Sequence, residues 1–382
     1  MSEIFPFSVT VPQADLDDLR ERLARTRWPE AETVDGWQQG VPLERLQAIC
    51  TYWREAYDWR RCEARLNALP QFRTEIGGLG IHFIHLRSPE PDATPLIISH
   101  GWPGSIVELL KVIEPLADPA RFGGDPRAAF HVVAPSLPGY GFSDRPVMAG
   151  WGADRIALSW AELMRRLGYD HYVAQGGDWG SLIATRMAAL KVSGLQAIHL
   201  NMLGRPPPEA AVDQPTEQEK GILAARTAYQ QDSAYAFIQA TRPQTVGYAL
   251  ADSPVAQAAW IYEKFYEWTD NRGDPEDALS KDDMLDAITI YWLTATGGSS
   301  AKLYWQAVPR LEGMEPVELR TGVSMFHKEF FRLSRRWAEP LFPNIIYWNE
   351  VPAGGHFAAF EQPEKFVREL QNFSAALKAS AT

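Results

Sequence analysis

Gly176-Gly177-Asp178-Trp179-Gly180 lies between two segments with different hydrophobic patterns. The apolar run Tyr172-Val173-Ala174 before it is typical of a buried strand, and residues 181–190 after it carry apolar side chains at helical spacing. Small residues two places on either side of a central side chain are what a nucleophile elbow requires, because this strand-to-helix turn is too tight for larger neighbours. The strain of such a turn pushes the central side chain into a cleft. We therefore predict that Asp178 is presented at the end of a strand.

The central residue of this turn is a carboxylate, whereas most such turns carry serine in the pattern Gly-x-Ser-x-Gly. A carboxylate can displace a leaving group at a saturated carbon and form an alkyl ester. The alternative interpretation of these five residues is an ordinary aspartate in a glycine-rich turn. A catalytic role for Asp178 therefore depends on partner residues elsewhere in the chain.

The bulk composition limits the kinds of partner that we expect. The chain has 382 residues, 46% of them hydrophobic, which is enough for one large domain with additions or for two domains. Its formal net charge is -11 and it has no stripe rich in lysine and arginine. Nucleic acid and anionic membrane surfaces are therefore poor candidate partners.

The cysteines and the N-terminus indicate where the protein works. Cys50 and Cys62 are the two cysteines, and they fit no metal-binding spacing. A chain of this size with two cysteines is typical of a reduced compartment. Residues 1–12 lack the pattern of a signal peptide, and nowhere do 18 apolar residues follow one another. We therefore expect a soluble, cytoplasmic protein.

The hydrophobic pattern divides the chain into four segments. Residues 1–72 are charged, rich in tryptophan and helical in period. Residues 73–204 alternate short apolar strands with helices, which indicates a parallel α/β sheet. Residues 205–310 are aromatic-rich helices, and strands resume in residues 311–382. We expect the helical block to form a cap over the carboxyl ends of the strands, where open α/β sheets bind ligands.

Short apolar runs mark the expected strands of this sheet. Their cores are residues 96–98, 131–133, 172–174, 197–200, 323–326 and 345–348. Helical patterns cover residues 105–116, 156–167 and 181–190. Before the first of these strands, Gly77-Gly78 predicts a hairpin of antiparallel strands.

A carboxylate nucleophile needs a base to release the ester, and the base needs a residue that orients it. His356 follows a glycine pair just past the last expected strand, where a loop can place its imidazole over Asp178. Glu329 follows the preceding strand and is our candidate acid; Glu339 and Glu350 are its rivals. The alternatives are a buried histidine satisfied by backbone groups and an exposed loop acid. The order Asp178, Glu329, His356 matches the order nucleophile, acid, base of the α/β hydrolases.

Ester hydrolysis also needs donors for the developing oxyanion. His100-Gly101-Trp102-Pro103-Gly104-Ser105 follows a strand, and the natural donor pair is the backbone N–H of Trp102 and that of Trp179. An ordinary tight turn explains this stretch equally well. His82 and His85 would point to opposite faces of a strand, so we expect no metal site there.

Read together, these motifs resemble those of the microsomal-type epoxide hydrolases. The resemblance spans essentially the whole chain. It rests on residues 26–29, 57–60, 69–72, 100–105, 135–141, 176–180 and 354–359.

The resemblance implies an α/β-hydrolase fold: a mostly parallel sheet flanked by helices, with a helical cap and an N-terminal wrapping segment. It places Glu329 at the acid position and Tyr235 and Tyr304 as cap tyrosines that hydrogen-bond the epoxide oxygen. It also implies a homodimer, no cofactor or metal, and a soluble enzyme without the membrane anchor of the animal relatives.

The expected reaction is hydrolysis of an apolar or aryl epoxide to a vicinal diol through a covalent ester on Asp178, in detoxification or secondary metabolism. A haloalkane dehalogenase with the same aspartate is the first alternative. A non-catalytic small-molecule binding protein on the same scaffold is the second.

Overall fold

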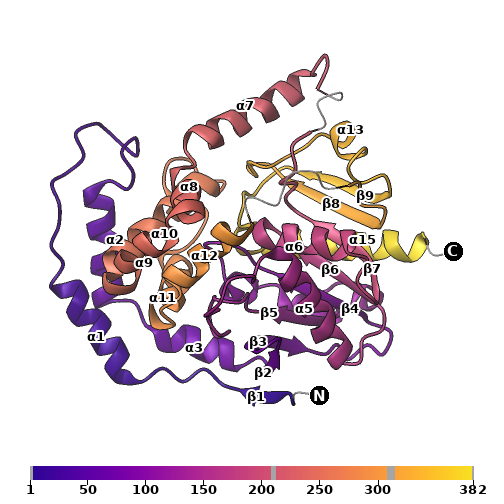
Figure 1. Ribbon diagram of the computed structural model, residues 1–382, viewed down its shortest axis with the longest axis horizontal. Coiled ribbons are helices and arrows are strands. Elements are labelled where there is room, and N and C mark those ends of the chain that lie inside the picture. The colour runs from indigo at the N-terminus through magenta and orange to yellow at the C-terminus, as the bar shows by residue number, and fades with distance from the viewer. Residues whose placement is uncertain (1–2, 208–211, 308–314, 381–382) are drawn as a thin grey trace.

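One sheet organises the molecule. The computed structural model of the chain describes residues 3–207, 212–307 and 315–380. Within these residues the sheet has nine strands in the order β1-β2-β3-β5-β4-β6-β7-β8-β9 (Figure 1). The strands are β1 Phe5–Phe7, β2 Gln71–Ile76, β3 Leu79–Leu86, β4 Thr94–Ser99, β5 Phe130–Pro135, β6 Tyr172–Gly176, β7 Leu195–Leu200, β8 Arg320–Phe326 and β9 Ile345–Val351.

The pairing changes from antiparallel to parallel along the sheet. Strands β1, β2, β3 and β5 pair antiparallel, and β5, β4, β6, β7, β8 and β9 pair parallel. The predicted hairpin is confirmed: Gly77 and Gly78 connect β2 and β3 with φ angles of 60° and 81°, as a two-residue hairpin turn requires. Strand β1 was not expected, because three residues are too few to show a pattern.

Helices cover both faces of the sheet, since all five residues of β6 and the last four of β4 are buried. Helices α5 and α6 pack together, and α4 packs on α15. These core helices are η1 Ile106–Leu109, α4 Ile113–Ala117, α5 Ala153–Arg166, α6 Asp178–Ala189, α13 Arg335–Ala338, α14 Ala358–Glu361 and α15 Pro363–Ala379. Short turns of 3-10 helix lie at η2 Pro119–Phe122 and η3 Pro126–Ala128.

The single helix predicted over residues 105–116 is wrong, because this stretch forms η1 and α4 instead. Pro115 has no N–H to donate to the carbonyl of Lys111, and its ring would collide with that carbonyl in a continuous helix.

The N-terminal segment contacts both the sheet and the cap. Its helices are α1 Gln13–Ala24, α2 Leu43–Glu55 and α3 Trp59–Asn67. Strand β1 pairs with β2, while the Trp53 indole donates to Thr289 Oγ1 (2.9 Å) and the Tyr57 hydroxyl donates to Asp286 (2.7 Å). Both of these acceptors belong to the cap helix α11. The segment therefore ties one edge of the sheet to the cap, along the outside of the molecule (Figure 1).

Helices between β7 and β8 form the cap. They are α7 Glu217–Gln231, α8 Ala234–Thr241, α9 Pro243–Asp252, α10 Pro254–Trp268, η5 Pro275–Asp277, α11 Lys281–Leu293 and α12 Gly297–Ala307. Helices α8, α9 and α12 pack on one another, and α10 packs on α11. The predicted boundary between cap and core at residues 310 and 311 lies outside the described residues.

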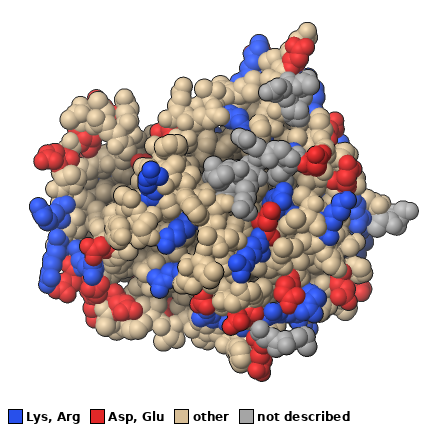
Figure 2. Space-filling model, in the orientation of Figure 1, with Lys and Arg blue, Asp and Glu red and all other residues tan. Residues whose placement is uncertain are grey.

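The described helices include none that is both long and apolar enough to span a bilayer. Over the described part of the face seen in Figure 2, basic and acidic side chains are interspersed. This distribution agrees with the absence of a basic stripe in the sequence.

Candidate active site

Asp178 lies at a sharp turn between β6 and α6. Its φ is +46°, a left-handed conformation that is strained for a residue other than glycine. A Cβ atom at Gly176 would collide with the backbone of Gly180, and one at Gly180 would collide with the carbonyl of Ser99. The small residues on either side are therefore required by the turn itself, as the elbow interpretation expects.

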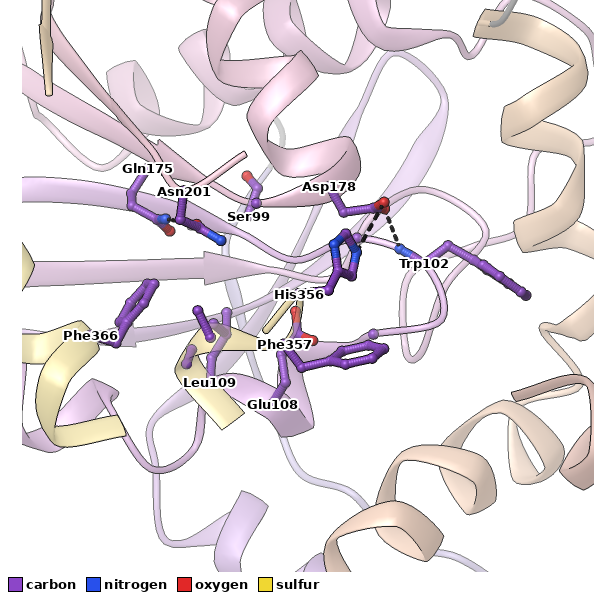
Figure 3. A pocket seen from close by; sticks show the side chains of 15 residues that line it. Ser99, Trp102, Glu108, Leu109, Gln175, Asp178, Asn201, His356, Phe357 and Phe366 are labelled. Atoms are coloured by element: carbon purple, nitrogen blue, oxygen red, sulfur yellow. Dashed lines mark hydrogen bonds and ion pairs between the residues drawn. The ribbon is translucent and has the colours of Figure 1, made fainter. Parts of the chain in front are cut away.

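The structure brings Asp178, Glu329 and His356 together at the carboxyl ends of three parallel strands. The His356 Nε2 atom lies 3.4 Å from Asp178 Oδ2, and Nδ1 lies 2.9 Å from Glu329 Oε2. Figure 3 shows the imidazole beside the aspartate. Glu329 follows β8 and His356 follows β9, and both are almost fully buried. The rivals of Glu329 have other partners: Glu339 accepts from Arg335, and Glu350 accepts from Gln218.

One of the two proposed oxyanion donors contacts the Asp178 carboxylate, and the other follows Asp178 directly in the chain. The backbone N–H of Trp102 donates to Asp178 Oδ1 at 2.7 Å (Figure 3). Trp179 is in the first turn of α6, where backbone N–H groups have no acceptor within the helix. One carboxylate oxygen is therefore held by an amide, and the other faces the histidine.

The two cap tyrosines lie side by side. Tyr235 of α8 and Tyr304 of α12 have ring centroids 6.0 Å apart, and both rings contact the Trp102 indole. The Tyr304 ring also packs edge-on against Trp179, with centroids 4.7 Å apart. Burial raises the pKa of both phenols well above the usual value, so both hydroxyls are protonated donors at neutral pH. Tyr229 shares a hydrogen bond of 2.9 Å with the Tyr235 hydroxyl.

Asp178 separates two cavities. The larger has a volume of about 220 Å³ and is mostly apolar; its lining includes both cap tyrosines, Leu182, Leu203 and Phe342. The smaller has a volume of about 30 Å³. It is the cavity drawn in Figure 3, where Asp178, His356, Glu108 and the paired amides Gln175 and Asn201 line it.

Comparison with known proteins shows the family of this chain. A family model described as "Epoxide hydrolase N terminus" matches residues 4–109, and one described as "alpha/beta hydrolase fold" matches residues 94–312. A protein of Stigmatella aurantiaca that carries an epoxide hydrolase name is 54% identical over 98% of this chain and 86% of its own length. The chain belongs to the epoxide hydrolase family.

Solved structures of epoxide hydrolases resemble this chain over nearly its whole length. The Aspergillus niger enzyme is 33% identical with a TM-score of 0.89, covering 98% of this chain and 97% of that one. The juvenile hormone epoxide hydrolase of the silkworm Bombyx mori is 30% identical with a TM-score of 0.90, covering 100% and 96%. The family, the α/β-hydrolase fold and the enzyme class predicted from the sequence are therefore confirmed.

The charge state of His356 depends on its two carboxylate neighbours. Burial alone would lower the pKa of the imidazole, but Glu329 and Asp178 raise it to about 10. In the resting epoxide hydrolase the imidazole is therefore protonated and paired with both carboxylates. Loss of the negative charge on Asp178 would remove one of the two interactions that raise this pKa.

The sequence did not predict the groups that hold residues 352–357, the histidine loop that carries His356 between β9 and α14. The His356 N–H donates to the carbonyl of Trp268 (2.9 Å), and the Glu361 carboxylate accepts the backbone N–H groups of Gly355, Phe357 and Asp270 at 2.7–3.0 Å. A Cβ atom at Gly355 would collide with the Trp268 carbonyl. Trp268 ends cap helix α10 and Asp270 follows it, so the cap positions His356. No sequence pattern marks contacts between segments this far apart in the chain.

Glu108 is a second missed residue. It lies in η1, lines the small cavity of Figure 3, and has a pKa that burial raises to about 8. Its sequence signal is weak: an acid placed four residues after Gly104 in the predicted oxyanion turn.

His82 and His85 are buried residues of β3. Both nitrogens of the His82 ring have partners, Ser136 Oγ at 2.9 Å and Gln71 Oε1 at 3.0 Å, and His85 contacts the Tyr169 hydroxyl. Burial lowers the pKa of His82 to about 3 and that of His85 to about 4, so both are neutral. In the part of the chain that the structure describes, no three His, Cys, Asp or Glu side chains form a group suited to a metal ion.

Proposed function

We propose that this chain hydrolyses an apolar or aryl epoxide to a vicinal diol, through an alkyl ester on Asp178 that His356 and Glu329 help to cleave. One observation carries the proposal. The Asp178 carboxylate lies between an apolar cavity that contains two phenols and a small cavity that contains an imidazole. This arrangement supplies an acid on the side of the ring oxygen and a base on the side where water attacks.

Ester formation is the first step. Asp178 Oδ1 is held by the Trp102 amide, so Oδ2 is the atom that attacks a ring carbon. The ring C–O bond breaks and its electron pair stays on the oxygen, which takes the phenolic proton of Tyr235 or Tyr304. General acid catalysis of this kind contributes roughly 10²–10⁴-fold to a rate. The product is a glycol monoester of Asp178.

Ester formation also switches the histidine from acid to base. The ester carries no charge, so His356 loses one of the two carboxylates that raise its pKa and releases its proton to solvent; it takes up one proton again when the Asp178 carboxylate re-forms. The small cavity of about 30 Å³ is large enough for a water, which needs roughly 10–15 Å³. A water in that cavity would lie beside His356, which lines it and would take the proton.

Hydrolysis of the ester completes the cycle. The water gives a proton to His356, and its oxygen adds to the ester carbonyl carbon. The oxyanion is stabilised by the N–H groups of Trp102 and Trp179, by about 3 kcal/mol per donor in comparable sites. The ester C–O bond then breaks, His356 returns its proton to the departing diol oxygen, and the proton left by the new carboxyl group restores the phenol.

The size of the larger cavity sets the substrate class. Its volume is about 220 Å³, and an engineered apolar cavity of about 150 Å³ in another protein binds benzene. A single aryl ring or a short alkyl chain with a terminal epoxide therefore fits. A screen of terminal aryl and alkyl epoxides with chiral analysis of the diols tests this, with Asp178→Asn as the inactive control. Diol production by the control at the wild-type rate would refute the role of Asp178.

One observation favours the dehalogenase alternative. The Trp179 indole N–H is buried and has no hydrogen-bond partner among the described residues, and it borders the larger cavity, where it could face a halide. The paired phenols suit an oxygen leaving group better. Halide release from a terminal haloalkane, measured beside diol formation from the matching epoxide, decides between the two reactions. The second alternative, a non-catalytic binding protein, would bind the epoxide tightly without turnover.

We also propose that the enzyme acts in the cytoplasm as a homodimer, in detoxification or secondary metabolism. The acidic net charge and the two free, buried cysteines support a reduced compartment. Light scattering on the purified enzyme tests the oligomeric state, and a monomer at micromolar concentration would contradict the dimer.

A further inference from the structure

A buried lysine of the cap faces a catalytic tyrosine. Lys264 lies on α10, and its side chain is 2% exposed. Its ammonium stands over the ring of Tyr235, 4.6 Å from the centroid, and 5.6 Å from the centroid of Trp268. Trp102 stacks on the same phenol with centroids 5.0 Å apart and an interplanar angle of 11°. Trp268 also packs against this ring, with centroids 5.1 Å apart, so the Tyr235 ring contacts one cation and two indoles.

This ammonium is balanced by two carboxylates. Lys264 Nζ donates to Glu267 Oε2 at 2.7 Å and to Glu263. Both carboxylates are partly exposed, whereas the ammonium is not. A buried charge is costly unless it is paired, and the two glutamates provide that pairing. The reaction steps derived above have no role for this cation.

We propose that Lys264 is a positioning residue that acts through Tyr235, making its hydroxyl the stronger of the two donors to the epoxide oxygen. The inference rests on the proposed function of Tyr235 as an acid. A cation over an aromatic face is attracted by the electron density of the ring. That density increases as the phenol gives its proton to the departing oxygen, so the attraction is greater in the transition state than in the ground state. Such an interaction accelerates ester formation.

The two tyrosines differ in this respect. Burial, the neighbouring Tyr229 and the Asp178 carboxylate raise the pKa of Tyr235 well above its usual value, which weakens it as an acid. By this proposal, the ammonium of Lys264 over the ring opposes that effect at Tyr235. Among the described residues, no lysine or arginine stands over the ring of Tyr304. Tyr304 therefore acts as the weaker donor, and the two phenols are not equivalent.

Single-turnover kinetics with a terminal aryl epoxide tests the proposal. Lys264→Met removes the charge and keeps the length of the side chain, and we expect ester formation to slow about tenfold. Ester hydrolysis should keep its wild-type rate, because the phenol has already reacted. Lys264→Arg should recover most of the loss. Lys281 stands over the Tyr52 ring at 5.5 Å and lines neither cavity of the site, so Lys281→Met is the matched control that should change neither step.

A double-mutant cycle separates this role from a structural one. In a Tyr235→Phe background, Lys264→Met should have no further effect on ester formation. An equal slowing with and without the Tyr235 hydroxyl, or an equal slowing of both half-reactions, would overturn the proposal. Undiminished ester formation in Tyr235→Phe alone would instead remove Tyr235 from the proposed function. If Lys264→Met does not fold, Lys264→Gln carries the same expectation, because its amide can still donate to the glutamates.

Discussion

Glu329→Gln should leave His356, the proposed base, unable to accept a proton from water. Glu329 Oε1 accepts the backbone N–H of Phe331 at 2.9 Å, and Oε2 accepts the proton on His356 Nδ1 at 2.9 Å. In a glutamine the amide oxygen must face the Phe331 N–H, so the NH2 group faces the imidazole. The imidazole must then carry its proton on Nε2, the nitrogen that should receive a proton from water.

The structure sets the size of the effect. In the productive tautomer the proton is on Nδ1, where it would face the NH2 group of the glutamine; an unsatisfied buried donor costs about 1–3 kcal/mol. The charged hydrogen bond between the imidazolium and Glu329, about 1.5–3 kcal/mol, is also lost. The sum of about 2.5–6 kcal/mol corresponds to roughly 10²–10⁴-fold slower ester hydrolysis. Ester formation needs no base and should stay within about threefold of wild type.

Rapid-quench kinetics with excess enzyme measures both steps. The glycol ester should accumulate on the variant and be visible by intact mass, with release of the diol as the slow phase. Glu350→Gln is the control: it is the rival acid near the same loop, its side chain contacts Gln218, and it should leave both steps unchanged. Ester hydrolysis within tenfold of wild type in Glu329→Gln would refute the reasoning, as would an equal loss of ester formation.

The remaining predictions concern the base, the donors, the histidine loop and pH. His356→Gln should consume about one epoxide per site and stall as the ester; absence of the ester by intact mass would refute its role. Replacing Tyr235 and Tyr304 together with Phe should slow ester formation by roughly 10²–10⁴-fold, and an undiminished step would exclude both. Gly355→Ala should lower the free energy of unfolding by about 1–3 kcal/mol and the Tm by a few degrees, because its Cβ would collide with the Trp268 carbonyl. Gly221→Ala, on an open helix face, should stabilise the protein slightly. Equal Tm values for the two variants would contradict the collision. The rate of ester hydrolysis should rise with pH, because only neutral His356 is a base. The midpoint of this pH profile should lie below the pKa of about 10 that His356 has in the free enzyme, because the ester removes the charge of Asp178. A midpoint at or above that value would contradict the change in the pKa of His356 on ester formation.

The sequence allowed prediction of those site residues whose signal is local. The glycines around Asp178 are required by collisions within the turn itself, so five residues are enough to predict it. Glu329 and His356 follow predicted strands, and parallel strands end at one edge of a sheet, so their approach to Asp178 follows from the topology. The tyrosines came only from the resemblance, because an aromatic residue on an apolar helix face is usually core.

The rest depended on contacts between distant segments. Lys264 looks like a surface charge in the sequence, and only the packing of α10 on α8 brings its ammonium over Tyr235. Glu361 and Trp268 hold the histidine loop through backbone groups, which no side-chain pattern records. The break in the helix predicted over residues 105–116 had a visible cause, Pro115, which the periodicity of the apolar residues concealed.

A single turnover in water labelled with heavy oxygen tests most directly whether a carboxylate oxygen of Asp178 forms the new bond to the ring carbon. With enzyme in excess, the diol should contain only unlabelled oxygen, and the label should appear in the peptide that contains Asp178. Label in the diol of that first turnover, with none in the peptide, would mean that water opened the epoxide directly and would contradict the covalent mechanism.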